Sequence, residues 1–395
     1  MKAPHRWPLT VSSFDLARRL RLAVWILRNR QWTAGPEVRA YEQRWEAITG
    51  ATHAIMVGNG SLANELVARR CRHELERDGH WLKRNRVVFP VCTWPTSVTP
   101  WLAAGFQPVW VEISPNLCGS FDQICEAITD RKSVGAVFFS SLLGRTGYLP
   151  ELEKLCTKHG IFLGVDNCEA SFSRTHDILG APGRHCCSYG TSTTSFYFSH
   201  HTTTGTEGGM IFTNNDEAAE WFRMARNHGL TRGMPEHYRN PNIDPLFDFC
   251  IEGTNARSSD LQAYMGSLVL DRSIAFAARR VAMADRFFTL LDRERFYYPA
   301  PSEREPLMSL PIIPHPTRRD VGDMKAHIHR VLHAQGIEYR PIVAGNLLRQ
   351  TAFKRYGDAS KFPLAEWVHK AGVYVGLHER VTDEMLEDLA LALNA

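Results

Sequence analysis

The stretch from Ser195 to Gly209 carries the densest group of side chains suited to chemistry. It reads Ser-Phe-Tyr-Phe-Ser-His-His-Thr-Thr-Thr-Gly-Thr-Glu-Gly-Gly, with His200 and His201 adjacent at its centre. Cys187 to Gly190 precedes it, and the apolar run Met210 to Thr213 follows it before a turn signal. This pattern predicts a strand, a functional loop and a second strand. A neutral imidazole in such a loop can act first as a base and then as an acid.

Other candidate residues follow predicted strands. Asp166 comes directly after the apolar run Ile161 to Val165, and Trp94 comes shortly after the run Arg86 to Phe89. Ligands of parallel sheets bind at the carboxyl ends of the strands, so we expect both side chains to lie beside the His200 loop. A carboxylate at that edge can accept a hydrogen bond from a protonated ring nitrogen, and an indole can stack on a flat ring.

A glycine turn begins one predicted helix. The strand His53 to Val57 leads into Gly58-Asn59-Gly60-Ser61, and a helical pattern follows over Leu62 to Glu74. Free backbone amides at the start of a helix bind phosphate, which makes Gly60 and Ser61 candidates for such a site.

The elements that must position these residues alternate between strands and helices. Apolar runs at 53–57, 86–89, 108–113, 135–140 and 161–165 are separated by helical patterns, and further helices are expected at 14–29, 37–49 and 217–226. Such alternation predicts an α/β domain with a mostly parallel sheet flanked by helices. A loop-like passage reaches Pro245, so we expect a large domain over residues 1–250 and a smaller α/β domain over 251–395.

Several motifs together resemble the DegT/StrS-type sugar aminotransferases, which depend on pyridoxal phosphate. The matching segments are Trp32 to Glu42, Gly60 to Asn64, Asp166 to Glu169, Ser195 to Gly209, Asn255 to Arg257, and Arg340 to Asn346. The resemblance implies an aspartate-aminotransferase-like fold of type I and a homodimer with shared active sites.

One departure from that family has a chemical consequence. The lysine that binds the cofactor covalently in the family is replaced by His200, and no lysine occurs between Lys158 and Lys325. Histidine can move a proton but cannot form that covalent bond. The pattern resembles the branch of 3-dehydratases that use pyridoxamine phosphate on a nucleotide-linked 4-keto-6-deoxyhexose. It implies a substrate similar to GDP-4-keto-6-deoxymannose, glutamate as amino donor, and a place in deoxysugar and O-antigen biosynthesis.

The resemblance assigns roles to individual residues. It implies that His200 is catalytic and that His228, in a His-Gly-Leu-Thr-Arg passage, lies near the amino-donor site. Arg340 is implied in substrate binding. The spacing from Ser195 favours His200 for the position of the family's lysine. The loop is one residue longer than usual in the family, so His201 is the alternative for that position. If His200 holds the lysine position, His201 is expected to contact the substrate. The expected cofactor contacts are Gly60, Ser61, Trp94, Asp166, Glu169, Ser195 and, from a neighbouring subunit, Asn255.

Alternatives remain open at this point. An aminotransferase would need a lysine outside the matching motifs, and a non-catalytic protein that binds the cofactor or a sugar nucleotide would also tolerate its loss. The formal charge of +4 over 395 residues does not suggest nucleic acid, and no apolar run predicts a signal peptide or a membrane span. We therefore expect a cytoplasmic protein. Nine cysteines without ligand spacing predict no metal.

Overall fold

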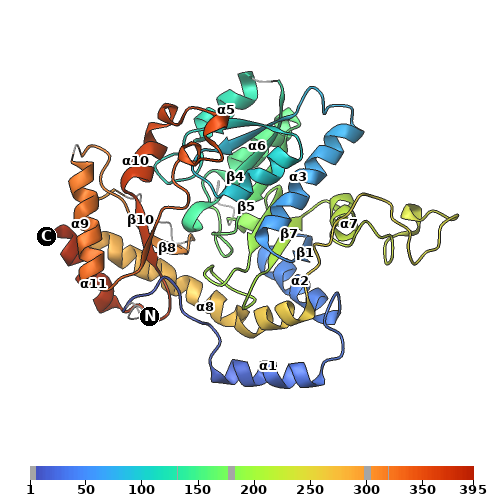
Figure 1. The fold of residues 1–395 in the computed structure, drawn as a ribbon, viewed down its shortest axis with the longest axis horizontal. Coiled ribbons are helices and arrows are strands. Elements are labelled where there is room, and N and C mark those ends of the chain that lie inside the picture. The colour runs from blue at the N-terminus through green and yellow to red at the C-terminus, as the bar shows by residue number, and fades with distance from the viewer. Residues whose placement is uncertain (1–5, 131, 177–182, 298–303, 319) are drawn as a thin grey trace.

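The computed structural model describes residues 6–130, 132–176, 183–297, 304–318 and 320–395 (Figure 1). Its main sheet has seven strands in the order β1-β7-β6-β5-β4-β2-β3. The four pairs from β6 to β3 are parallel, whereas β7 runs antiparallel to both β6 and β1. The strands are β1 (His53–Val57), β2 (Arg86–Pro90), β3 (Gln107–Val111), β4 (Val134–Ser140), β5 (Phe162–Asp166), β6 (Thr191–Ser195) and β7 (Gly209–Thr213).

Helices cover both faces of this sheet, so its strands are largely buried and most of them are apolar, whereas the buried strand β6 consists of Thr and Ser. Ala54 and Met56 of β1 pack into a core shared with α2, α5, α6 and α8, while Ile55 and Val57 pack against α3, α4 and α7. Alternate residues of a strand point to opposite faces, so one run supplies both cores. These helices are α2 (Pro36–Thr49), α3 (Gly60–Arg77), α4 (Thr99–Ala103), α5 (Phe121–Asp130), α6 (Leu149–His159), α7 (Asp216–Ala225) and α8 (Asp260–Leu290).

The predicted mostly parallel α/β sheet is confirmed, with one local correction. The expected strand at Cys187 to Gly190 is wrong, because Cys186–Ser188 forms a short 3-10 helix and the strand begins at Thr191. Gly190 has a φ of +52° and would place a Cβ only 2.4 Å from the carbonyl oxygen of Leu163. The chain therefore turns at this glycine before it enters β6.

A second sheet of three antiparallel strands lies beside the first, in the order β8-β10-β9. It contains β8 (Ser309–Ile312), β9 (Tyr339–Pro341) and β10 (Val373–Gly376), with α9 (Val321–Ala334), α10 (Pro363–Ala371) and α11 (Asp383–Asn394) around it. The amino-terminal segment joins this unit, since the buried Trp7 donates a hydrogen bond to the carbonyl of Gly376. The division into domains at residue 250 stays a prediction.

Two features project from this body in Figure 1. Helix α1 (Leu16–Arg28) lies outside α8 and has no buried residue. The passage between α7 and α8, which we call the arm (residues 230–250), extends away from the sheet and holds only a short 3-10 helix, Glu236–Tyr238. Within the described residues, no helix is both long enough and apolar enough to span a membrane.

Candidate active site

Asp166 is the last residue of β5, and its carboxylate is held by three donors. Asn64 Nδ2 lies 2.8 Å from Oδ2, Ser97 Oγ lies 2.7 Å from the same atom, and the Cys168 N–H donates to Oδ1 at 3.0 Å. Thr193 Oγ1 donates to the amide oxygen of Asn64 at 2.7 Å and so fixes the orientation of that amide. A buried, rigidly held acceptor therefore sits at the carboxyl edge of the sheet.

The start of α3 lies against the end of β6. A Cβ on Gly60 would stand 2.8 Å from the Cβ of Ser195, and a Cβ on Gly209 would stand 2.4 Å from the carbonyl of Asn59. Only glycine permits these two approaches. They bring the Gly60 and Ser61 amides next to the Ser195 hydroxyl, in an arrangement suited to a phosphate, while Asn59 Oδ1 accepts from the Leu62 N–H at 2.8 Å and caps the helix.

Ser61 and Trp94 lie on the solvent side of this candidate phosphate site, which we call the phosphate cup (Gly60, Ser61 and Ser195). Ser61 is exposed and donates from Oγ to Thr96 Oγ1 at 2.9 Å. Trp94 follows β2 and is 54% exposed, so its indole is free of the protein core. Packing in the core, the alternative explanation for a tryptophan at this position, does not account for such exposure.

His200 is half-buried in the loop between β6 and β7. Its backbone N–H donates to the Tyr197 carbonyl at 3.1 Å, and the two rings meet edge to face at 5.7 Å. Among the described residues, no group makes a hydrogen bond with its buried Nδ1 atom. Burial lowers the pKa of His200 to about 4, and the interaction with the Ser195 backbone and the negative charge of Asp166 oppose this effect in part. The imidazole is therefore neutral at neutral pH and can accept a proton.

Threonines close the loop that carries His200. Thr203 Oγ1 donates to the Phe196 carbonyl at 3.1 Å and accepts from the Gly205 N–H at 2.9 Å, while Thr204 Oγ1 donates to the Glu207 carbonyl at 2.7 Å. Both threonines are buried. Thr203 and Thr204 thus fix the path of the loop that is one residue longer than usual.

His201, the alternative residue for the lysine position, points into the protein interior. It is 5% exposed, its Nε2 lies 2.7 Å from the Pro306 carbonyl oxygen, and its ring meets Phe172 edge-on. Burial and the charge of Arg280 hold its pKa well below the usual range. The expected substrate contact of His201 stays a prediction, and nothing in these contacts directs the ring toward Asp166.

Glu169 is a carboxylic acid with an unusual protonation equilibrium. Burial raises its pKa to about 7; the hydrogen bond from the Leu143 N–H, at 2.8 Å from Oε2, opposes this rise and the charge of Asp166 adds to it. The charge of Glu169 also acts on Tyr374 of β10, where burial raises the pKa to about 12. Tyr374, on the small sheet, is therefore near enough to Glu169 for the two groups to interact electrostatically. Tyr374 was not among the residues predicted for the site, although it stands between two valines.

Arg340 lies on β9 directly opposite Tyr374 of β10. Its side chain is exposed, with Nη2 at 2.9 Å from Glu338 Oε1 and Nη1 at 3.0 Å from the Tyr339 carbonyl. Glu338 Oε2 in turn accepts from the Leu9 N–H at 3.0 Å. The amino-terminal segment therefore helps to hold the carboxylate that orients Arg340.

His228 and Asn255 lie together at the base of the arm and are both exposed. His228 has a φ of +63° and donates from its N–H to the Thr254 carbonyl at 2.9 Å, while Asn255 Oδ1 accepts from Arg257 Nε at 3.1 Å. In the described parts of the chain, neither makes a hydrogen bond or ion pair with Asp166 or His200. Their predicted roles at the amino-donor site and across a subunit boundary stay predictions.

One group in the described residues has metal-ligand chemistry, and it stands apart from these side chains. His185, Cys186 and Cys187 precede β6 and place their ligand atoms within 4.8 Å of one another. Their ligand atoms already make internal contacts, since His185 Nδ1 accepts from the Cys187 N–H at 3.2 Å and Cys186 Sγ donates to the Ala170 carbonyl at 3.1 Å. This cluster therefore adds nothing to the site around Asp166.

The sequence matches the DegT/DnrJ/EryC1/StrS aminotransferase family over residues 15–394. The chain belongs to this family. A relative from Escherichia coli O55:H7, GDP-4-keto-6-deoxy-D-mannose 3-dehydratase, is 27% identical over 370 residues, which cover 90% of this chain and 91% of that protein. The dehydratase of the same name from Yersinia pseudotuberculosis is 26% identical and the match covers 97% of each chain.

Solved structures support the same placement within the DegT family. The Escherichia coli dehydratase with bound hydrated pyridoxal phosphate superimposes with a TM-score of 0.85 at 26% identity, over 99% of this chain and 100% of that chain. A variant of GDP-4-keto-6-deoxymannose-3-dehydratase with bound GDP-perosamine gives a TM-score of 0.86 at 26% identity, over 98% and 100%. The predicted family, its resemblance to these dehydratases and the aminotransferase-like fold are confirmed.

Proposed function

We propose that this protein is a pyridoxamine-phosphate-dependent dehydratase. It removes the 3-hydroxyl of a nucleotide-linked 4-keto-6-deoxyhexose similar to GDP-4-keto-6-deoxymannose, a reaction of deoxysugar and O-antigen biosynthesis. The observation that carries the proposal is His200: a neutral imidazole with a free Nδ1 stands where the family has its lysine, in a chain without lysine from 159 to 324.

The described residues fit pyridoxal phosphate and its amino form. The phosphate would bind at Gly60, Ser61 and Ser195, where a Cβ on Gly60 would fill the space at Ser195. Asp166 would accept from the ring nitrogen, and the exposed indole of Trp94 would cover one ring face. Glu169 would lie near the ring hydroxyl. We assign the large domain, residues 1–250, to this binding.

The bound cofactor supplies an amine for the C4 ketone and a ring that accepts electrons. His200 would take a proton from the reacting carbon at its free Nδ1, acting as a base. It would then act as an acid and give a proton to the departing 3-hydroxyl, which leaves as water. Its low pKa keeps the base form available at neutral pH. Trp94 excludes water from the reacting atoms, and Asp166 keeps the opposite end of the ring in place.

The small domain, residues 251–395, would supply part of the substrate site. Arg340 presents an exposed guanidinium that suits a diphosphate or a carboxylate, and Glu338 holds it on one side. Glutamate is the proposed amino donor, with His228 near its site. A related dehydratase has been solved with a trapped PLP-glutamate geminal diamine, which supports glutamate as the donor here.

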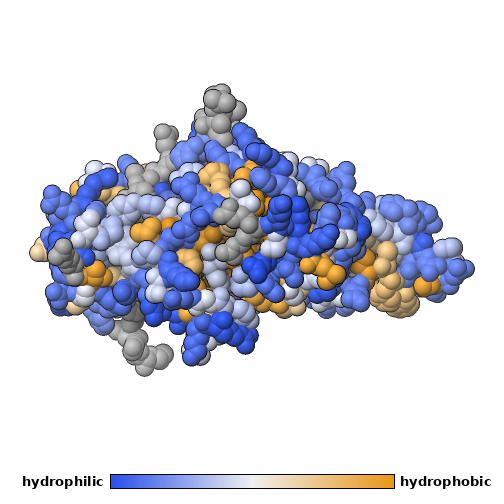
Figure 2. All heavy atoms as spheres, turned by 90° about the horizontal axis from the view of Figure 1, so that it is seen from above, coloured by the Kyte–Doolittle hydropathy of each residue, from blue (hydrophilic) through white to orange (hydrophobic). Residues whose placement is uncertain are grey.

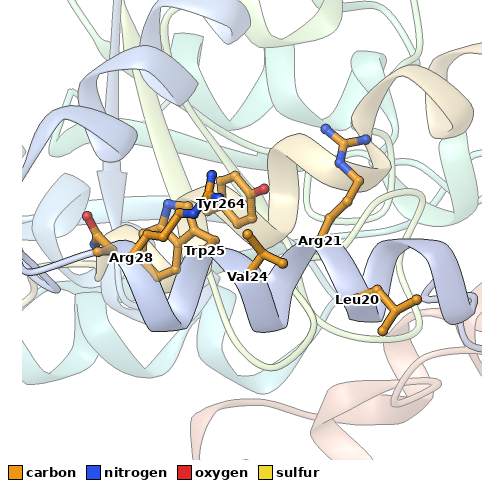
Figure 3. Close-up of a pocket in the computed structure, with 7 residues that line it drawn as sticks. Leu20, Arg21, Val24, Trp25, Arg28 and Tyr264 are labelled. Carbon is orange, nitrogen blue, oxygen red and sulfur yellow. The ribbon is translucent and has the colours of Figure 1, made fainter.

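We also propose a homodimer with shared active sites. On α1, Leu16, Leu20 and Leu27 are 72%, 59% and 85% exposed. Leu20 also lines a groove of 470 Å³, where Figure 3 shows Trp25 against Tyr264 of α8. The arm exposes four further apolar residues, and Figure 2 shows apolar surface near it. These four are Ile243, Leu246, Phe247 and Phe249. Such exposure suits a second copy better than solvent.

The proposal is tested with purified protein, pyridoxal phosphate and glutamate. The absorbance of the aldehyde form should change to that of the amino form, and later addition of GDP-4-keto-6-deoxymannose should release ammonia and the 3-deoxy-4-keto sugar. An amino sugar without ammonia would support an aminotransferase instead. An unchanged spectrum would support a protein that binds without catalysis.

A further inference from the structure

His200 and His201 are adjacent in sequence, but their rings have different surroundings. His200 is half-buried with a free Nδ1, whereas His201 is 5% exposed and its Nε2 lies 2.7 Å from the carbonyl oxygen of Pro306. Since a carbonyl only accepts, Nε2 of His201 must carry the hydrogen. This bond therefore restrains the residue that directly follows His200.

The segment that receives this bond is itself fixed on two sides. The buried Arg280 of α8 donates from Nη1 to the carbonyls of Leu307 and Met308, at 3.0 and 2.7 Å. The Met308 N–H donates to the Leu143 carbonyl at 3.1 Å. Residues 306–308 lead directly into β8, so they connect the small sheet with α8 and with the loop around Leu143.

The same segment touches the loop that holds Glu169. The Leu143 N–H donates to Glu169 Oε2 at 2.8 Å, and the neighbouring Gly144, at a φ of +98°, would place a Cβ 2.6 Å from the Pro306 carbonyl oxygen. This close approach leaves the Pro306 carbonyl little room to move. The backbone of residues 306–308 thus accepts the hydrogen bond of His201 and also bonds to Leu143, which donates to Glu169.

We propose that His201 is a positioning residue that sets the direction of His200 through its hydrogen bond to Pro306. The inference rests on the proposed function of His200. It replaces the substrate contact that the sequence suggested for His201, because the ring would have to leave a bonded interior position to reach a ligand. Loss of the bond removes one restraint on the residue beside His200, and a base displaced by about 1 Å loses on the order of 100-fold in rate.

The test compares two variants of His201 with a matched control. His201→Phe keeps the ring without a donor and should lower kcat by roughly 10- to 100-fold, while the KM of the nucleotide sugar stays near that of the wild type. His201→Gln retains a donor amide and should recover part of kcat. The control is Thr202→Val, since the buried Thr202 hydroxyl has no hydrogen-bond partner among the described residues, and it should stay within about twofold of the wild type.

A second readout does not depend on activity. In the cofactor-free wild type, nitrogen NMR should show His201 as the Nε2-protonated neutral tautomer, without titration between about pH 5 and pH 8. A rise in KM at constant kcat in His201→Phe, or a His201 that titrates or carries its proton on Nδ1, would overturn the inference. If the wild type dehydrates no sugar, the proposed function of His200 fails, and the NMR result still decides whether His201 is fixed to Pro306.

Discussion

Asn64 donates a hydrogen bond of 2.8 Å to Asp166 and thereby ties α3 to the end of β5. The first turn of α3 carries the phosphate cup, and Asp166 is the acceptor for the ring nitrogen in the proposed function. One buried amide therefore couples the residues proposed to hold opposite ends of the cofactor. Ser97 supports the same carboxylate oxygen with a second bond of 2.7 Å.

We expect Asn64→Leu to weaken binding of pyridoxal phosphate by at least about tenfold, because it removes one donor and leaves Asp166 less fixed. Ser97→Ala removes only one hydroxyl and should have a smaller effect. Titration of each apo protein with the cofactor, followed by absorbance, measures both dissociation constants. Equal affinity in Asn64→Leu and wild type would show that Asp166 needs no support from α3.

The buried ion pair of Arg226 and Glu42 should be important for stability. Glu42 is 2% exposed, and its Oε1 accepts from Arg226 Nη1 at 2.6 Å and from the Met56 N–H at 2.8 Å. Arg226→Met leaves that charge without its nearest partner and should lower the free energy of unfolding by roughly 3–5 kcal/mol. Arg286→Met, which breaks an exposed pair, is the control and should unfold in urea close to the wild type.

Glu169 should make the free energy of unfolding decrease as the pH rises. Its pKa is raised from 4.5 to about 7 in the folded protein, so the folded state binds the proton more tightly than the unfolded state. Its stabilising contribution is complete below about pH 4.5 and is lost as the pH rises through 7. Urea unfolding should therefore show the wild type losing stability relative to Glu169→Gln over this range. A constant difference between the two proteins would contradict the raised pKa.

Glu338 should affect substrate affinity only slightly. It lies 2.9 Å from Arg340 Nη2, but the Arg340 side chain is 53% exposed, and exposed pairs contribute little. We expect Glu338→Gln to raise the KM of the nucleotide sugar by at most about fivefold at unchanged kcat. Arg340→Met should raise it further. Steady-state kinetics would contradict this assignment if Arg340→Met bound the sugar as well as wild type does.

The alternation of apolar runs allowed most of the main sheet to be predicted, since most of its buried strands are apolar, whereas β6 is buried but consists of Thr and Ser. The strand before the His200 loop was misplaced, because Cys187 to Gly190 has strand-like residues but its glycine needs a positive φ. Antiparallel pairing of β7 with β6 and β1 was also not predicted, since sequence runs carry no direction.

Candidate site residues that belong to one sequence motif could be predicted. Residues that the fold brings together from distant segments could not. Asp166, Ser195 and His200 follow from strand ends and a loop. Asn64 and Ser97 support Asp166 from segments far apart in the chain, and Tyr374 and Glu169 interact electrostatically across a similar separation in sequence. Only the three-dimensional structure shows these contacts.

The central claim is that His200 moves the proton in a dehydration. The most direct measurement is the rate of ammonia release from GDP-4-keto-6-deoxymannose by wild type and by His200→Asn, with pyridoxal phosphate and glutamate present. We expect a loss of roughly 100-fold or more in His200→Asn, while binding of pyridoxal phosphate is retained. A His200→Asn variant that releases ammonia at the rate of the wild type would contradict it.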